Sequence, residues 1–224
     1  MGLKRINKPE PLAKTALKSL RHSILTNELT AGVVYNEQSL ARDLGISRTP
    51  VREALLELAS KRLVKFLPQK GVVINTFPTK DIEDLFETRT VLEVFSIKKI
   101  CLNHKNIDIS ILKEHLFKQK SAFKDQDAHL FIAADRRFHI DLAKLTDNNY
   151  LIDMMNDIRD LMQLMGFKAL NIKGRMEEVV KEHENILKAV VQGDSIKAME
   201  LMEHHLNYSK IAVNKIKEEE KKNG

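Results

Sequence analysis

The chain has 224 residues, enough for two ordinary domains or one large one with a sizeable core. Its single cysteine excludes an intrachain disulfide and fits a reducing compartment. The N-terminus shows no apolar signal segment, and no apolar run is long enough to span a bilayer, so we predict a soluble, cytoplasmic protein without a membrane partner.

The net charge of +6 is concentrated near the N-terminus. Residues 1–78 hold 13 Lys and Arg against 6 Asp and Glu, whereas residues 79–224 hold 24 against 25. This asymmetry indicates a front end that binds a polyanion, attached to a nearly neutral body. Charge by itself is weak evidence, because many basic faces are merely solvated.

The front end begins with a basic arm, residues 1–11, and continues as a predicted DNA-binding domain over residues 12–76. Its first apolar stripe predicts a helix that starts at the domain boundary and ends before Gly32. Asn36 is a suitable N-cap for a short second helix, and Gly45 supplies the sharp exit of a helix-turn-helix.

The third helix begins at Ser47 or at Thr49, and either start gives the same faces. Arg48 and Arg52 then project together from the outer side, with Thr49 at the exposed N-terminal end. Arginine can donate two parallel hydrogen bonds to guanine, and hydroxyl or backbone N–H groups can contact phosphate. We predict a recognition helix for the major groove, with Ser47 among its DNA-contacting residues. The alternative for the arginine pair alone is two solvated side chains on a surface helix.

Two β-prone runs, residues 63–67 and 72–75, follow the third helix and flank a turn. Three helices followed by this hairpin make a winged helix. Lys70 and Gly71 lie at the tip of the wing, where a missing side chain lets backbone approach phosphates or the minor groove.

The resemblance to a known family rests on consecutive residues in this front end, namely Asn36-Glu37-Gln38-Ser39-Leu40-Ala41, Gly45-Ile46-Ser47-Arg48-Thr49-Pro50-Val51-Arg52-Glu53-Ala54-Leu55 and Lys70-Gly71. They resemble the GntR family of bacterial transcription regulators. The resemblance implies that Arg48, Thr49, Arg52 and Gly71 contact DNA. Two positions depart from the family pattern: Gln38 stands where some members have a DNA-contacting arginine, and Arg62 stands where a glycine often precedes the wing.

The body, residues 77–218, is predicted to be an all-helical domain for metal binding, effector binding and dimerisation, with a charged tail over residues 219–224. Its periodicity predicts helices over residues 79–103, 108–124, 127–145, 149–169, 174–192 and 195–218. The expected fold is therefore mainly α, a winged helix-turn-helix followed by an antiparallel bundle of six to seven helices.

Four polar residues lie on apolar stripes of these helices. Asp135 and His139 leave the same face of one helix, and His183 and His205 lie in the stripes of two others. A buried carboxylate is costly unless it is paired or coordinated, so the group indicates a bound cation. Three imidazoles and one carboxylate suit Zn²⁺, Ni²⁺ or another first-row transition metal better than Ca²⁺ or Mg²⁺. Each histidine taken singly is more often a satisfied core residue than a ligand.

Arg89 falls on the buried stripe of the first body helix, where a guanidinium needs an anionic partner. One reading is an internal salt bridge within the bundle. The other is a small carboxylate effector, held by Arg89 through a bidentate contact and by the open positions of the metal.

The body contains the segments Arg89-x-x-Leu92-Glu93, Asp135-x-x-Phe138-His139, Asn148-x-x-Leu151, Glu182-His183-x-x-Ile186 and Met202-x-x-His205-Leu206. These segments resemble the FCD ligand-binding domain of the FadR-type branch of the GntR family. In metal-binding members of that branch, the residues matching Asp135, His139, His183 and His205 hold the metal. The resemblance favours the carboxylate reading of Arg89 and argues against a fatty-acyl effector, because the acyl-CoA-responsive members lack the metal site.

We therefore predict a transcription regulator, a repressor rather than an activator, that binds a two-fold symmetric double-stranded DNA operator as a homodimer. A small carboxylate at the metal site would control its operator affinity. The alternatives are a regulator that senses the metal alone, a purely structural metal, and a metal-dependent hydrolase or lyase. No separate general acid or base stands out in the sequence, so we do not expect an enzyme.

Overall fold

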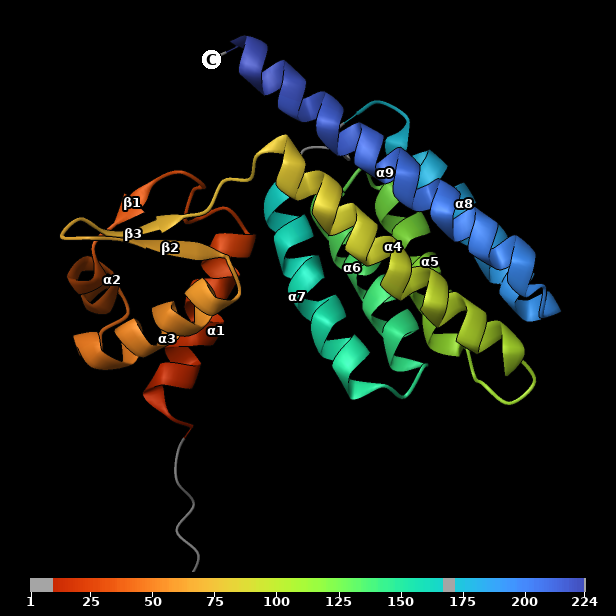
Figure 1. Ribbon diagram of the computed structural model, residues 1–224, viewed down its shortest axis with the longest axis horizontal. Coiled ribbons are helices and arrows are strands. Elements are labelled where there is room, and N and C mark those ends of the chain that lie inside the picture. Colours follow the sequence, from red (N-terminus) through yellow and green to blue (C-terminus); the bar gives the residue numbers. More distant parts are fainter. Residues whose placement is uncertain (1–9, 167–171, 224) are drawn as a thin grey trace, which may run out of the picture. The chain divides into compact units, whose positions relative to one another are not determined.

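The computed structural model describes residues 10–166 and 172–223, which fall into two compact units, residues 1–76 and residues 77–224 (Figure 1). Each unit has a hydrophobic core of its own. None of the described helices is both long and apolar enough to cross a membrane.

The first unit contains three helices and a small antiparallel sheet. The helices are α1 (Leu12–Leu25), α2 (Glu37–Asp43) and α3 (Arg48–Ser60), and the strands are β1 (Val34–Tyr35), β2 (Val64–Leu67) and β3 (Gly71–Ile74) in the order β1-β3-β2. Helix α3 packs on α1 through a set of buried apolar side chains, which includes Leu20, Ile24, Val51, Leu55 and Leu58. The arrangement is the expected winged helix-turn-helix.

Helix α1 ends at Leu25, before Gly32 as predicted, and Asn27 then adopts a left-handed conformation with φ of 63°. One detail of this unit differs from the sequence prediction. Strand β1 was not expected, since two residues are too few to show an alternating pattern; it pairs with β3 through Val34 and Tyr35. Asn36 caps α2 as predicted, and its side chain accepts hydrogen bonds from the backbone N–H groups of Gln38 and Ser39.

The second unit consists, over its described residues, of six helices. They are α4 (Thr79–Leu102), α5 (Ser110–Lys124), α6 (Ala128–Lys144), α7 (Asn149–Gly166), α8 (Arg175–Gln192) and α9 (Ser195–Asn223). In Figure 1, α4 and α9 run side by side, and α5 and α6 lie behind α4. The predicted end of α7 at residue 169 lies outside the described residues. Helix α9 continues to Asn223 and so includes most of the segment predicted as a charged tail.

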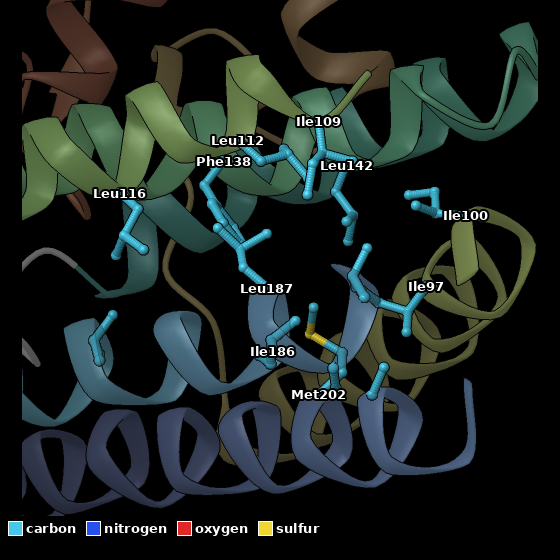
Figure 2. Close-up of a cluster of buried hydrophobic side chains, with 14 of the residues drawn as sticks. Ile97, Ile100, Ile109, Leu112, Leu116, Phe138, Leu142, Ile186, Leu187 and Met202 are labelled. Carbon is cyan, nitrogen blue, oxygen red and sulfur yellow. The ribbon is translucent and has the colours of Figure 1, made fainter. Parts of the chain in front are cut away.

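One core joins five of these helices (Figure 2). Fully buried side chains reach it from α4, α5, α6, α8 and α9, for example Ile97, Leu112, Phe138, Ile186 and Met202. Burying one such aliphatic or aromatic side chain contributes roughly 1.5–3 kcal/mol to the free energy of folding. At the edge of this core, the Phe138 ring stacks on the His183 ring with centroids 4.1 Å apart. One face of the buried His183 ring is therefore packed directly against the apolar core of the second unit.

Candidate functional site

The outer surface of the first unit is built by the start of α3 and the tip of the β2–β3 hairpin. Arg48 and Arg52 lie one helical turn apart with 61% and 51% of their side chains exposed. Ser47 occupies the N-cap position of α3, although its side chain makes no cap hydrogen bond. Ser47, Thr49 and Lys70 are exposed.

A groove of about 380 Å³ joins several of these residues. Its lining comprises Asn36, Glu37, Gln38, Arg48, Arg52 and the segment from Phe66 to Gly71. The structure therefore brings Arg48, Arg52, Lys70 and Gly71 to one concave surface, while Ser47 and Thr49 do not line it. Gln38, which stands where some members of the family have a DNA-contacting arginine, also lines this groove.

Gly71 has a structural reason to be glycine. Its φ is +117°, and a Cβ atom there would lie 2.3 Å from the backbone oxygen of Tyr35 in the neighbouring strand β1. No side chain can occupy that position without moving the sheet. The close approach shapes the wing itself, independently of any contact that Gly71 makes with DNA.

The second unit brings three of the four predicted metal ligands together in its interior. His139 on α6, His183 on α8 and His205 on α9 are buried, and one ring nitrogen from each lies within 4.8 Å of the others. The Nε2 atoms of His183 and His205 are 3.4 Å apart. Asp135, one turn before His139, places its Oδ1 atom 3.7 Å from the Nε2 atom of His139 and 3.9 Å from that of His183.

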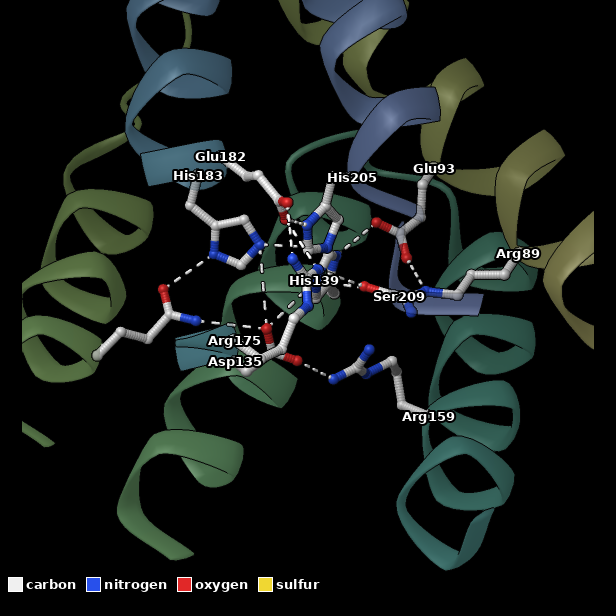
Figure 3. A network of polar contacts seen from close by, with 11 residues as sticks. Arg89, Glu93, Asp135, His139, Arg159, Arg175, Glu182, His183, His205 and Ser209 are labelled. Carbon is white, nitrogen blue, oxygen red and sulfur yellow. Dashed lines mark hydrogen bonds and ion pairs between the residues drawn. The ribbon is translucent and has the colours of Figure 1, made fainter. Parts of the chain in front are cut away.

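These spacings are compatible with a single metal ion. The ligand atoms of a tetrahedral site with metal bonds of about 2.1 Å lie roughly 3.4 Å apart. Figure 3 shows the three rings in one cluster with Asp135 beside them, so the two ligand types converge from three helices. The Asp135 carboxylate is already engaged by a second residue, because its other oxygen, Oδ2, accepts a hydrogen bond of 2.5 Å from Arg159.

Each of the three histidines has an oxygen acceptor at its Nδ1 atom. Glu93 Oε2 faces His139, Gln119 Oε1 lies 2.9 Å from His183, and Glu182 Oε2 lies 2.6 Å from His205. These acceptors place the ring proton on Nδ1 and leave a lone pair on Nε2, which is the tautomer of a metal-bound histidine held by a second hydrogen bond. Nε2 of each ring is therefore an atom that could serve as a metal ligand.

The electrostatics of the cluster favour neutral imidazoles at His183 and His205 and a charged carboxylate at Asp135. Burial lowers the pKa of His183 well below its usual value, and burial also lowers the pKa of His205 to about 4 despite the Glu182 carboxylate. Burial raises the pKa of Asp135, but Arg159 and His139 outweigh it and hold that pKa well below the usual range. Neutral imidazole and ionised carboxylate are the protonation states that a metal requires.

Arg89 is buried on α4, as its place in the apolar stripe predicted. Its Nε atom donates to Glu93 Oε1 at 2.5 Å, so the internal salt bridge is formed. Its Nη2 atom lies 3.0 Å from His139 Nε2. Arg89 also lines a cavity of about 80 Å³ next to the histidines, together with Arg136, Arg159 and Arg175.

The sequence analysis assigned no role to the residues that surround the predicted ligands, which are Glu93, Gln119, Arg159 and Glu182. Glu93 carried a detectable signal, because it follows Arg89 by one helical turn and so shares its buried stripe. Arg159 is paired with Asp135 across two helices, a contact that helical periodicity cannot reveal.

Two family models match the chain. The model described as bacterial regulatory proteins, gntR family, matches residues 12–74, and the model described as the FCD domain matches residues 84–208.

Individual relatives agree with both models. The gluconate operon transcriptional repressor of Bacillus licheniformis is 29% identical over 170 residues, covering 75% of this chain and 68% of the relative. An uncharacterised helix-turn-helix regulator of Bacillus subtilis is 25% identical over 223 residues, covering 98% of each chain. The crystal structure of a putative GntR transcriptional regulator from Rhodococcus sp. has a TM-score of 0.79 at 22% identity, covering 90% of this chain and 96% of that one.

Proposed function

Because the chain belongs to the gntR family of bacterial regulatory proteins and carries an FCD domain, we propose that it is a repressor whose operator affinity is controlled by a small carboxylate bound at a metal site in its helical unit. Transcription regulation and DNA binding follow from the family, whose members are regulators rather than enzymes. A relative named as the repressor of a gluconate operon supports repression as the direction of control.

The groove of the first unit supports a DNA-reading role for α3. Arg48 and Arg52 reach it from one face of that helix, and Lys70 reaches it from the wing. Two arginines at the start of a helix can contact guanine edges, while Lys70 and the exposed hydroxyls of Ser47 and Thr49 suit phosphate contacts. Gly71 has no side chain, so its backbone is able to approach the duplex closely.

Asp135, His139, His183 and His205 are the proposed metal ligands. The donor set, three neutral nitrogens and one carboxylate oxygen, favours Zn²⁺ or Ni²⁺. A bound ion would supply a Lewis-acidic position for a carboxylate oxygen. Arg89 Nη2 has to leave His139 Nε2 when that nitrogen serves as a ligand, and the guanidinium then faces the adjoining cavity.

The cavity beside the histidines is the observation that carries the carboxylate hypothesis. Each of its arginines is paired with at least one acid, in the pairs Arg89–Glu93, Arg136–Asp160, Arg159–Asp135 and Arg175–Glu182, and Arg175 also contacts the exposed Glu178. A divalent ion would therefore add positive charge that no side chain of these pairs offsets. An anionic ligand would supply the missing negative charge beside the arginines of the cavity.

An exposed apolar stripe on α4 supports the homodimer. Val91, Phe95 and Leu102 lie on one side of that helix and are 69%, 50% and 69% exposed. A second copy of the chain is the proposed occupant, because a winged helix buries little surface on DNA and a dimer doubles its contacts. The same symmetry accounts for a two-fold operator.

The test begins with metal. Elemental analysis of the purified chain should find a transition metal, and His205→Ala should reduce its content. The neighbouring His204→Ala should retain it, because His204 is exposed and lies one residue out of phase with the buried stripe of α9. Full metal retention by His205→Ala would remove that residue from the ligand set.

The second arm measures DNA binding. A duplex selected from a random pool is titrated with stripped, zinc-loaded and nickel-loaded protein, each with acetate, lactate, succinate or gluconate. We expect one or more acids to weaken DNA binding by about 5- to 150-fold in loaded protein only. If the affinity for DNA changed with the bound metal but with none of the acids, the protein would be a metal sensor. If the affinity for DNA changed with neither the metal nor the acids, the metal would have only a structural role.

A further inference from the structure

Glu37, the first residue of α2, joins the two arginines of α3. Its Oε2 atom accepts a hydrogen bond from Arg48 Nε at 2.9 Å, and its Oε1 atom accepts one from Arg52 Nη1 at 2.7 Å. One carboxylate thus uses one oxygen for each arginine. The contact crosses from the first helix of the helix-turn-helix to the second.

The carboxylate itself is fixed. Only 7% of the Glu37 side chain is exposed, against 61% and 51% for the two arginines. Asn36 caps α2 immediately before it, so the backbone of Glu37 is held in the first turn, where the helix dipole favours negative charge. Burial raises the pKa of Glu37, but the hydrogen bonds from Arg48 and Arg52 outweigh it and hold the pKa below its usual value.

The contacts leave both guanidinium groups able to bind elsewhere. Within the part of the chain that the structure describes, Arg48 donates to Glu37 through Nε and retains both Nη groups. Arg52 donates through Nη1 and retains Nε and Nη2 on the opposite edge. Each arginine therefore keeps a pair of parallel N–H donors, which is the arrangement that recognises the O6 and N7 atoms of guanine.

A second contact restrains Arg52. Its Cζ atom lies 5.6 Å from the centroid of the Phe66 ring in β2, within the range of a cation–π interaction. Arg52 is thus held between α2 and the wing, and Arg48 is held by α2. Long, exposed arginines otherwise sample many rotamers, and fixing them in advance lowers the entropic cost of a specific contact.

We propose that Glu37 is a positioning residue that sets the sequence selectivity of Arg48 and Arg52. It does not touch the bases; it fixes the direction in which two exposed guanidinium groups leave the protein surface. The inference rests on the proposed DNA-reading roles of those arginines. Two other roles are possible for this acid. Glu37 could simply repel the phosphates of DNA, or it could simply hold α2 against α3.

The experiment uses the full chain and a pool of double-stranded DNA with a random central segment. Wild type, Glu37→Gln, Glu37→Asp and the control Glu53→Gln, an exposed acid on α3, each select their preferred sequences. Dissociation constants are then measured, over a range of salt, for the duplex selected by the wild type and for a scrambled duplex. Thermal unfolding of every variant is recorded in parallel.

We expect Glu37→Gln to reduce the ratio of scrambled to selected dissociation constants by about tenfold or more. Its affinity for the scrambled duplex should stay the same or increase, because phosphate contacts need charge rather than direction. Glu37→Asp keeps the charge but is one methylene shorter and cannot reach both arginines, so it should lose selectivity as well. Glu53→Gln should keep the wild-type ratio.

Three results would overturn the proposal. Equal gains in affinity for both duplexes in Glu37→Gln, with an unchanged ratio in Glu37→Asp, would mean simple repulsion. Equal losses for both duplexes together with a lower unfolding temperature would mean a purely structural role. Unchanged ratios in both variants would mean no role. Arg48→Ala, included in the same selection, tests the DNA-reading role of Arg48 separately from the role of Glu37. If this variant selected the same DNA sequence as the wild type, Arg48 would not read a base.

Discussion

Arg89 Nη2 lies 3.0 Å from His139 Nε2, the nitrogen through which His139 would bind a metal. The candidate effector residue and a candidate metal ligand are therefore in direct contact. Metal and effector binding in this unit are then expected to be coupled, because both involve the position of one guanidinium group.

Arg89→Lys tests that coupling. Lysine can still neutralise Glu93 but presents a point charge instead of a planar fork, so the bidentate carboxylate contact is lost. We expect carboxylate binding by zinc-loaded protein to weaken about tenfold or more in calorimetry, with zinc binding no weaker than in the wild type. Arg137→Lys, an exposed arginine of α6, is the matched control. Unchanged carboxylate affinity in Arg89→Lys would remove Arg89 from the effector site.

Glu182→Gln probes the hydrogen bond that orients His205. The amide accepts more weakly than the carboxylate and can present NH₂ to Nδ1, so we expect metal affinity to fall about 10- to 100-fold in a competition titration with a chelator. Glu178→Gln is the control, because both glutamates contact Arg175 but only Glu182 is hydrogen-bonded to His205. Equal effects of the two variants would assign the loss to Arg175 instead.

Gly71→Ala should destabilise the first unit. The added Cβ atom would lie 2.3 Å from the Tyr35 backbone oxygen, and the positive φ of 117° disfavours any side chain. We expect a loss of more than about 1 kcal/mol in the free energy of unfolding, measured with urea. Gly45→Ala shares a positive φ, 67°, but meets no atom within 4 Å, so it should cost less. The reverse order would contradict a steric role for Gly71.

Phe95→Glu should weaken the proposed dimer. It places a charge in the exposed apolar stripe of α4, where a partner helix would have to bury it. Sedimentation equilibrium should show a shift toward monomer, and binding to a two-fold operator should weaken with it. Phe117→Glu on α5, an aromatic that is also exposed, should leave the dimer intact. A dimer unaffected by Phe95→Glu would place the interface elsewhere.

Local patterns in the sequence were sufficient for the fold class and for much of the candidate site. The apolar stripes placed Arg89, His139, His183 and His205 in the interior, and the structure buries all four. This worked because helical periodicity reports which side of each helix is buried. The same reasoning missed strand β1, because two residues cannot show a period.

Contacts between elements were decided only by the tertiary structure. The sequence could place His205 on an inner face, but the choice of Glu182 as its Nδ1 acceptor depends on how α8 packs on α9. It left Arg89 with two possibilities, an internal salt bridge or a carboxylate effector. Glu93 lies one turn further along the same helix, whereas the contact of Arg89 with His139 depends on how α4 packs on α6. No pattern in the sequence indicated a role for Glu37. Its contact with Arg48 and Arg52 depends on the turn between α2 and α3, which brings its carboxylate between the two guanidinium groups. Periodicity fixes a direction around one helix axis, whereas these partnerships depend on the distances and angles between axes.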